Sequence, residues 1–330
     1  MAAKAIINQL KLAYSPLSNR DFTVLRNDPD IQACLKSSSL YAICQRPELQ
    51  FVNLIYSQAE LSVKLEIHQE NNPNILLIEF SLKQERLEID FSKTVLAYVG
   101  SHKNNAQLED FPLSNFSGFR LHESEDGHTL GKFIVWFTPE KLLQNIWNGG
   151  IIANVIGKIS DFTNYQVHYV GKATDQRVWK RLTGHDTLQD ILSLENPIAI
   201  DSLPTHEIAI LFFAFRDNLH IQRFTNESDE SEFADFVLGN NFPEQKTIFL
   251  DAEKALINIM MPKYNKELFK NYPKSKDGLY KNSYEQITYS FIDPITLNYE
   301  LGQIRGGLNA FGGDTIIIEN NKHARILKAD

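Results

Sequence analysis

The 330-residue chain contains only two cysteines, Cys34 and Cys44, so it cannot carry a disulfide framework. Its cysteine and histidine spacing matches no structural zinc motif. No apolar run approaches the ~18 residues that span a bilayer; the longest runs from Ile208 to Phe215. The N-terminal sequence lacks the long apolar region of a signal peptide. These absences predict a soluble, cytoplasmic protein that does not act at a membrane.

The signatures of several enzyme classes are missing too. There is no Gly-x-Gly-x-x-Gly after a strand, no Walker loop, no Gly-x-Ser-x-Gly elbow and no His-Glu-x-x-His. The glycine-rich stretch at 302–313 lacks the helix start that a phosphate cradle requires. The sequence therefore gives little support to these classes.

Acidic residues exceed basic ones, and the formal net charge of −8 argues against a uniformly basic nucleic-acid-binding protein. The charge is uneven along the chain, however. Residues 151–185 carry five basic and two acidic side chains, and residues 252–281 carry seven and three. Residues 186–251, between them, carry three and thirteen. If folding joins the two basic segments, they form a local positive surface suited to a phosphate backbone.

The first half of the chain is predicted to be mainly antiparallel β-structure. Apolar residues alternate with polar ones at 61–68, and strands are also expected at 75–80, 87–91 and 133–137. A short helix should then start at Thr138-Pro and stop at Asn148-Gly-Gly. At about 150 residues per domain, this glycine pair is the first expected boundary. We predict a β-rich accessory or recognition domain over residues 1–148.

The pattern changes after this boundary. Two adjacent strands are expected at 151–159 and 165–170, a helix at 175–192, a buried strand at 208–215 and a helix at 250–261. This order predicts an α+β fold in which a central three-stranded sheet is flanked by helices, over residues 149–272. Short strands after Tyr272 predict a β-rich C-terminal extension over residues 273–330.

Residues of the central segment suit phosphodiester hydrolysis. Tyr169 ends a strand, and Arg181 and His185 stand four residues apart on the predicted helix. Glu253 lies near the start of the last helix, and Asn265 follows that helix. The reaction needs a proton acceptor, positive charge on the phosphate and usually a metal ion held by a carboxylate. Tyr169 or His185 suits the proton transfer, Arg181 the phosphate, and Glu253 a Mg²⁺ or Mn²⁺ ion.

The order Tyr169-Val-Gly, Arg181-x-x-x-His185 and Glu253-x-x-Leu-Ile, followed by Pro-x-Tyr-Asn265, resembles the GIY-YIG nuclease superfamily over roughly residues 151–270. That family hydrolyses DNA phosphodiesters with one divalent metal ion and includes homing, restriction and repair nucleases. The resemblance implies that Tyr169 is the tyrosine of the second motif, that Arg181 contacts the phosphate and that Glu253 binds the metal. It also implies that His185 matches the nearby helical His or Tyr and Asn265 the structural or site-edge asparagine.

The family's first motif, Gly-Ile-Tyr, is not found about a dozen residues before Tyr169, where residues 155–159 read Val-Ile-Gly-Lys-Ile. In the family this tyrosine is often proposed to deprotonate the attacking water. Lys158 with a depressed pKa, Tyr165 or His168 from the second strand, or the helical histidine would then act as the base; otherwise the site is inactive. Strand alternation puts Tyr165 on the face of Tyr169, which favours Tyr165 over His168.

Basic residues around these positions suit a DNA groove. The predicted contacts to nucleic acid are Lys172, Arg177, Lys180, Lys263, Asn265 and Lys266, and Lys270, Lys274 and Lys276 follow them. Tyrosines interleave the second group, which suits tracking of the backbone with occasional base stacking.

We therefore predict a metal-dependent endonuclease that cleaves double-stranded DNA, with a restriction-type enzyme as one version. Residues 1–148 and the C-terminal strands would supply substrate recognition or the contacts of a homodimer. The alternative is a catalytically inactive, nuclease-like module that binds nucleic acid or a protein partner. A structural or assembly protein is the third hypothesis.

Overall fold

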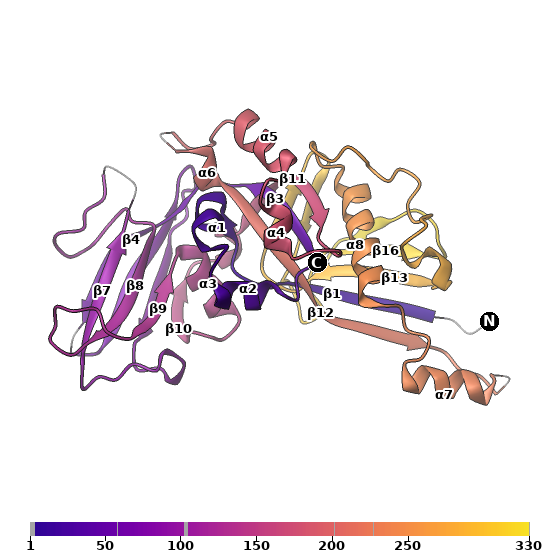
Figure 1. Cartoon of the computed structure of the whole chain (residues 1–330), viewed down its shortest axis with the longest axis horizontal. Helices are drawn as coiled ribbons and strands as arrows, with labels where there is room; N and C mark the ends of the chain where they lie inside the picture. Colours follow the sequence, from indigo (N-terminus) through magenta and orange to yellow (C-terminus); the bar gives the residue numbers. More distant parts are fainter. Residues whose placement is uncertain (1–3, 58, 102–104, 201, 227, 330) are drawn as a thin grey trace. The chain divides into compact units, whose positions relative to one another are not determined.

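The structure is a computed structural model that describes residues 4–57, 59–101, 105–200, 202–226 and 228–329. It divides into two compact units (Figure 1). The first comprises Met1–Arg46, Asn164–Asn196 and Leu203–Asp330, and the second comprises Pro47–Thr163 and Pro197–Ser202. The second unit is thus inserted into the chain of the first.

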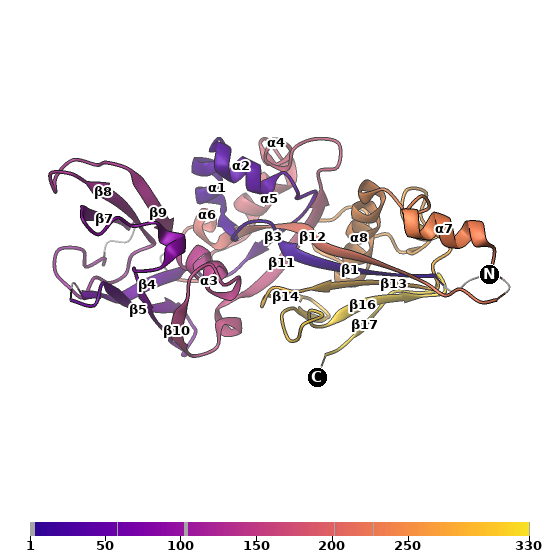
Figure 2. The same ribbon diagram turned by 90° about the horizontal axis from the view of Figure 1, so that it is seen from below.

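A ten-stranded mixed sheet forms the first unit (Figures 1 and 2). Its strand order is β15-β14-β11-β3-β12-β1-β13-β16-β17, and β2 pairs with β12. The pairs β1–β13 and β11–β14 are parallel, and the other named pairs are antiparallel. The strands are β1 (Lys4–Leu12), β2 (Leu17–Ser18), β3 (Leu40–Gln45), β11 (Asn164–Lys172), β12 (Ile208–Gln222), β13 (Gln286–Phe291), β14 (Thr296–Tyr299), β15 (Gly302–Arg305), β16 (Thr315–Glu319) and β17 (Arg325–Leu327).

Helices cover part of this sheet. They are α1 (Asn19–Leu25), α2 (Pro29–Leu35), α4 (Val178–Leu182), α5 (Asp186–Leu194), α6 (Pro204–Glu207), α7 (Glu230–Leu238), α8 (Gln245–Met260) and the 3₁₀ turn η3 (Leu279–Asn282). Figure 2 shows α4, α5 and α8 on one side of the sheet. Helix α8 packs against β11, and its residues 248–257 are all buried. This packing fixes α8 over the strand that carries Tyr169.

The predicted fold class was wrong. Strands β11, β3 and β12 are neighbours, but they do not form a separate three-stranded sheet flanked by helices. The N-terminal strand β1 pairs with β12 and β13, and the C-terminal strands lie at both ends of the same sheet. One sheet therefore joins what the sequence suggested as a β-rich N-terminal domain, a central domain and a C-terminal β extension. Apolar periodicity identifies a strand and its buried face, but it carries no information on a partner that lies hundreds of residues away.

Elements encoded by local signals were predicted correctly. The strand at 208–215 lies within β12, and the helix at 250–261 covers α8 from Leu250 to its C-cap Met261, although α8 starts five residues earlier. Helix α3 (Pro139–Trp147) begins where expected, because the Thr138 side chain accepts a hydrogen bond from the Lys141 amide at 3.3 Å. These elements depend on their own caps and apolar faces rather than on distant partners.

Two other local predictions failed. Residues 87–91 form no strand, and Leu87 is the last residue of the 3₁₀ turn η1 (Glu85–Leu87). The predicted strand at 151–159 is the shorter β10 (Ala153–Ile156), which pairs with β6 of the second unit and not with β11. The strand next to Tyr169 is therefore a different one from the strand that the sequence suggested.

The second unit contains two antiparallel sheets and its own apolar core. One sheet has the order β10-β6-β5-β4, and the other has the order β7-β8-β9. Their strands are β4 (Leu49–Ser57), β5 (Ser62–Gln69), β6 (Leu76–Ser81), β7 (Thr94–Gly100), β8 (Gly118–Ser124) and β9 (Phe133–Phe137), with η2 at Ile159–Phe162. Within the described residues of both units, no helix is long and apolar enough to cross a membrane.

Asp314 connects the two ends of the ten-stranded sheet, which is nearly closed. Arg305 ends the edge strand β15, whereas Asp314 directly precedes β16, near the other edge. The fully buried Asp314 carboxylate accepts hydrogen bonds from the Arg305 amide at 3.0 Å and from its guanidinium at 2.9 and 3.2 Å. Lys328 and the Ala329 amide donate to the same carboxylate at 3.1 and 3.0 Å. Burial alone would raise the pKa of Asp314, but these donors hold it well below its usual range.

We predict that Asp314→Asn lowers the free energy of unfolding by about 3 kcal/mol at neutral pH, because it removes the buried carboxylate that accepts charge-assisted hydrogen bonds from the partly exposed Arg305 and Lys328. Since the pKa of Asp314 is lowered in the folded protein, its stabilising effect exists above the pKa of the unfolded chain and is lost as the pH falls. The difference between wild type and variant should therefore shrink under acidic conditions. Urea unfolding at several pH values measures it, with the exposed Asp217→Asn as the control, and a pH-independent difference would contradict this assignment.

Candidate functional site

A cluster of polar side chains gathers where β3 and β11 run side by side. The Tyr41 hydroxyl of β3 lies 3.0 Å from Nε2 of His185. The ring of Tyr169, on β11, lies 6.1 Å from the ring of Tyr41 and 5.3 Å from that of His185, centroid to centroid. Arg181 is close enough to shift the pKa of both tyrosines, and Glu253 is close enough to shift that of Tyr169. The structure thus brings Tyr169, Arg181, His185 and Glu253 together, and adds Tyr41.

The pairing of β3 with β11 explains why both tyrosines face the cluster. Tyr41 lies opposite Gly171, and Ile43 lies opposite Tyr169. A β-bulge follows Val167, which is paired with Cys44. Because neighbouring residues of β3 point to opposite faces, the bulge puts Tyr169 on the face of Tyr41 and leaves Val167 on the other.

Gly171 is required by this arrangement. A Cβ atom at Gly171 would lie 2.7 Å from the hydroxyl oxygen of Tyr41 and 2.5 Å from Cε1 of Tyr169. Any side chain would therefore displace both rings. The glycine of the Tyr169-Val-Gly motif has a steric role in the cluster.

The predicted helix over 175–192 is broken into α4 and α5 at Gly184, which adopts a φ of +74°. Arg181 lies on α4, but His185 is the N-cap of α5, so the two residues do not share one helical face. The His185 Nδ1 accepts a hydrogen bond from the Leu188 amide at 3.2 Å. A neutral His185 therefore carries its proton on Nε2 and donates it to the Tyr41 oxygen. Both ring nitrogens are engaged, which argues against His185 as the base.

Burial shifts the pKa values of Tyr41, Tyr169 and His185 in the directions that favour their uncharged forms. Burial raises the pKa of Tyr41 and of Tyr169, and the Arg181 charge partly opposes both shifts. Burial and the Arg181 charge lower the pKa of His185. Arg181 is thus the side chain that favours a tyrosinate and disfavours an imidazolium.

Glu253 brings a carboxylate to the cluster from α8. Its side chain is 10% exposed, and its Oε2 lies 3.1 Å from the Lys172 ammonium. Burial raises the pKa of Glu253, and Lys172 partly offsets this effect. Helix α8 is itself anchored by the buried Asp251, which accepts hydrogen bonds from the hydroxyls of Tyr272 and Tyr289 at 2.6 and 2.8 Å.

The donor set at Glu253 fits one divalent cation. Carboxylate oxygen is a preferred ligand of Mg²⁺, and an ion held by one carboxylate completes its shell with water and substrate oxygens. Within the ranges that the structure describes, no three His, Cys, Asp or Glu side chains form a metal cluster. The Oε2 atom of Glu253 is buried and has no hydrogen-bond partner among the described residues, so one carboxylate oxygen suits such an ion.

Asn265 fixes the strand of Tyr169 from its far side. Its side-chain oxygen accepts from the Val170 amide at 2.9 Å, and its side-chain nitrogen donates to the Val170 carbonyl at 2.8 Å. Asn265 was predicted to contact nucleic acid, but its side chain is hydrogen-bonded to the backbone of β11. Lys263 is likewise engaged, since its ammonium lies 2.6 Å from the Glu195 carboxylate.

Some proposed substitutes for the missing tyrosine lie apart from the cluster. Tyr165 precedes the bulge and is 1% exposed, with the Arg46 guanidinium 5.7 Å from its ring centre. The bulge therefore separates Tyr165 from the face of Tyr169, contrary to the expected alternation. His168 lies 3.0 Å from the Gln45 side chain, and Lys158 belongs to the second unit.

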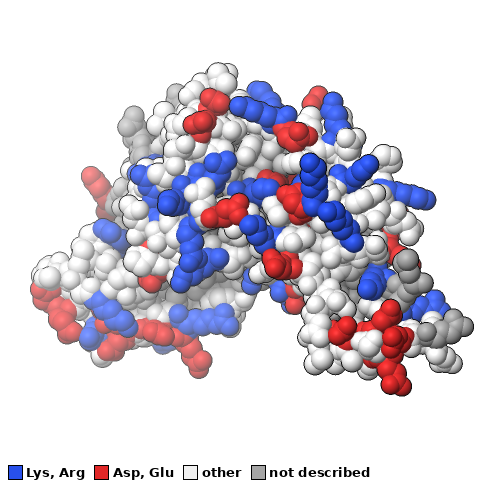
Figure 3. Space-filling view, turned by 45° about the vertical axis from the view of Figure 1, so that its right-hand side comes forward, with Lys and Arg blue, Asp and Glu red and all other residues white. Residues whose placement is uncertain are grey.

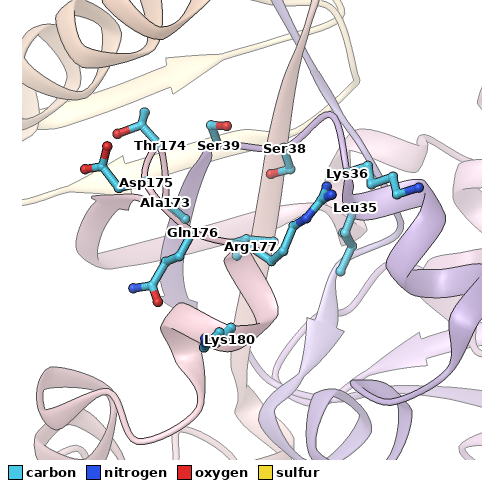
Figure 4. A pocket seen from close by; sticks show the side chains of 11 residues that line it. Leu35, Lys36, Ser38, Ser39, Ala173, Thr174, Asp175, Gln176, Arg177 and Lys180 are labelled. Carbon is cyan, nitrogen blue, oxygen red and sulfur yellow. The ribbon is translucent and has the colours of Figure 1, made fainter.

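Lys and Arg side chains gather over the central part of the face drawn in Figure 3, while acidic ones crowd at the lower right, where α7 lies. Two hollows of the first unit carry part of this basic charge. The first, which we call the α4 hollow, has a volume of about 470 Å³ and is lined by Lys36, Arg177 and Lys180 (Figure 4). Arg177 stands between the loop that follows β11 and the residues that precede β3.

The second hollow, the lysine hollow, has a volume of about 700 Å³. It follows α8 and is lined by Lys254, Lys266, Lys270, Lys274 and Lys276, with Glu267 and Asp277 among them. The Lys254 ammonium is buried and lies 2.9 Å from the Asp277 carboxylate. Of the predicted basic contacts, Arg177, Lys180 and Lys266 thus line open hollows, whereas Lys172 is paired with Glu253.

Tyr41 is the member of the cluster that sequence reasoning missed. Its signal was present as a tyrosine, in Ser39-Leu-Tyr41, at the start of an apolar run. The neighbouring strand was expected about a dozen residues before Tyr169, whereas the second unit is inserted between β3 and β11.

We predict that the pKa of His185 lies below the ordinary value of about 6.5 and rises in Arg181→Ala, because the variant removes a neighbouring positive charge. NMR titration of the histidine rings measures both values. Lys180→Ala, one residue away on α4, is the control and should leave the His185 titration unchanged. A wild-type pKa above 6.5, or no change in Arg181→Ala, would contradict the assigned environment.

No protein-family model, curated protein or solved structure matches this chain. What the chain does is therefore inferred from the arrangement of its own side chains.

Proposed function

We propose that this protein is a metal-dependent endonuclease of GIY-YIG type that hydrolyses phosphodiester bonds of double-stranded DNA in the cytoplasm. The observation that carries this proposal is the convergence of Tyr41, Tyr169, Arg181, His185 and Glu253. These residues come from five different segments of the chain. Such a gathering of an arginine, two tyrosines and a buried carboxylate supplies the groups that the reaction needs.

Tyr41 takes the place of the tyrosine that the family resemblance required. Its oxygen accepts a hydrogen bond from His185 and interacts electrostatically with the Arg181 charge. Both interactions stabilise a tyrosinate against the opposing effect of burial. We assign Tyr41 as the acceptor of the proton from the attacking water, and His185 as the residue that holds Tyr41 in position.

Arg181 and Glu253 have complementary roles in this proposal. Arg181 binds a non-bridging phosphate oxygen and neutralises the negative charge that develops there. Glu253 holds Mg²⁺ or Mn²⁺, which when bound acts as a Lewis acid on the phosphate. Tyr169 packs beside Tyr41 on the same face of the sheet and orients the ring of Tyr41.

The two basic hollows support a nucleic acid as the substrate. Arg177, Lys180 and Lys266 line them, and the lysines after α8 add further positive charge. Such side chains bind phosphates without reading the sequence. A homodimer, with recognition by the second unit, and a restriction-type activity remain parts of the same proposal.

We predict that purified protein cleaves plasmid DNA with Mg²⁺ or Mn²⁺, and that Glu253→Gln and Arg181→Ala each reduce the rate by about 10²-fold or more. Tyr41→Phe should cost about 10²- to 10⁴-fold, since it removes the proton acceptor. Glu244→Gln, Arg223→Ala and Tyr299→Phe are matched controls that should keep wild-type rates. A protein that binds duplex DNA but leaves varied DNA substrates intact would be the inactive binding module instead.

We also predict that the cleavage rate rises with pH from neutral to alkaline conditions. The pKa of Tyr41 is raised by burial, so the tyrosinate is the minor form at neutral pH and its fraction grows as the pH increases. A pH–rate profile at saturating metal concentration measures this effect. Residual cleavage by Tyr41→Phe should lack the rise, and an identical profile in the variant would exclude Tyr41 as the acceptor.

A further inference from the structure

Lys172 occupies the position at Glu253 that a cation would take. Its ammonium lies 3.1 Å from Oε2 of Glu253. This oxygen is buried and makes no hydrogen bond within the described residues, so the contact is an ion pair without hydrogen-bond geometry. The oxygen therefore retains lone pairs that suit a metal ion.

A second cation at this oxygen would be repelled by the cation already there. A divalent ion bound at Glu253 would lie within a few ångströms of the ammonium, where like charges repel strongly in a partly buried site. Lys172 must consequently move away before a metal ion is bound tightly. Its side chain is 31% exposed, whereas that of Glu253 is 10% exposed, so the lysine rather than the carboxylate is free to move.

Other negative groups lie within reach of Lys172. Lys254 lowers the pKa of Asp277, at the lysine hollow, Lys246 lowers that of Asp175, at the α4 hollow, and the Lys172 charge adds to both effects. Lys172 is thus close enough to interact electrostatically with one acidic residue of each hollow. A phosphate bound at either hollow would attract the lysine away from Glu253.

We infer that Lys172 is a displaceable counter-ion that keeps the cation position at Glu253 closed until a substrate phosphate draws the lysine away. This inference rests on the proposed function, because it takes Glu253 as the metal ligand. It makes metal binding and nucleic-acid binding mutually reinforcing, since each removes an obstacle to the other.

Mn²⁺ binding tests the inference without reference to cleavage. Electron paramagnetic resonance at pH 8.5, without nucleic acid, gives the affinity of wild type and of Lys172→Met. We expect the variant to bind Mn²⁺ about tenfold tighter or more, which corresponds to about 1.4 kcal/mol. Lys246→Met, which removes an exposed lysine 2.5 Å from Asp175, is the matched control and should bind as wild type does. Lys172→Gln serves as a second variant if thermal unfolding shows that Lys172→Met is misfolded.

Glu253→Gln separates this inference from the proposed function. If Glu253→Gln abolishes Mn²⁺ binding while Lys172→Met binds no tighter than wild type, the counter-ion role is overturned and the metal ligand stands. If Glu253→Gln, in the wild-type and Lys172→Met backgrounds, binds Mn²⁺ undiminished, Glu253 is not the ligand and the proposed function loses its metal site.

Mn²⁺ binding in the presence of a DNA duplex tests whether a phosphate exchanges with Glu253 as the partner of Lys172. In the Tyr41→Phe background, which keeps every charge of the site, a 20-base-pair duplex should strengthen Mn²⁺ binding. Adding Lys172→Met should reduce this strengthening, because the obstacle is already gone. Equal strengthening with and without Lys172 would overturn the exchange.

Discussion

The register between β3 and β11 is the constraint on which the candidate site depends. It sets Tyr41 opposite Gly171, and the bulge after Val167 turns Tyr169 to the same face. Because side chains alternate along a strand, a regular strand of the same length would put Tyr169 on the face of Val167, opposite to Tyr41 and away from Arg181. The bulge is further held in place by Asn265, which binds both backbone groups of Val170. The Pro-Lys-Tyr-Asn segment thus acts on the position of Tyr169 through the backbone of β11.

The site also depends on the pairing of two strands, β3 and β11, that are far apart in the sequence. The second unit separates β3 from β11 along the chain, yet the two strands pair over six residue pairs. The entropic cost of closing such a connection grows only slowly with its length. An inserted unit with its own apolar core lowers that cost further, because its ends are already fixed when it folds. An insertion at this point is therefore compatible with an undistorted pair of strands.

Local signals in the sequence identified four members of the cluster but not the geometry that joins them. Tyr169, Arg181, His185 and Glu253 were found because their motifs are short and each lies on a locally encoded element. The continuous helix was wrong because α4 ends at Leu182 and the chain turns at Gly184 before His185 caps α5. Tyr41 was missed because no local sequence pattern indicates which strand pairs with β11. The face of Tyr165 was wrong because a bulge leaves no mark in the alternation of apolar residues.

A protein with a net charge of −8 can still present a surface to a polyanion if its charges are separated in space. At physiological ionic strength, charges interact over about 8 Å, so the local balance decides what binds. The acidic residues Asp229, Glu230, Glu232 and Asp235 belong to α7 and its cap, at the end of the long strand β12. The lysines instead line the hollows beside α4 and after α8. Glu253 is an acidic group within this basic region, and its burial is tolerated because Lys172 neutralises it. The same pairing that allows the carboxylate to be buried therefore also controls its access to any other cation.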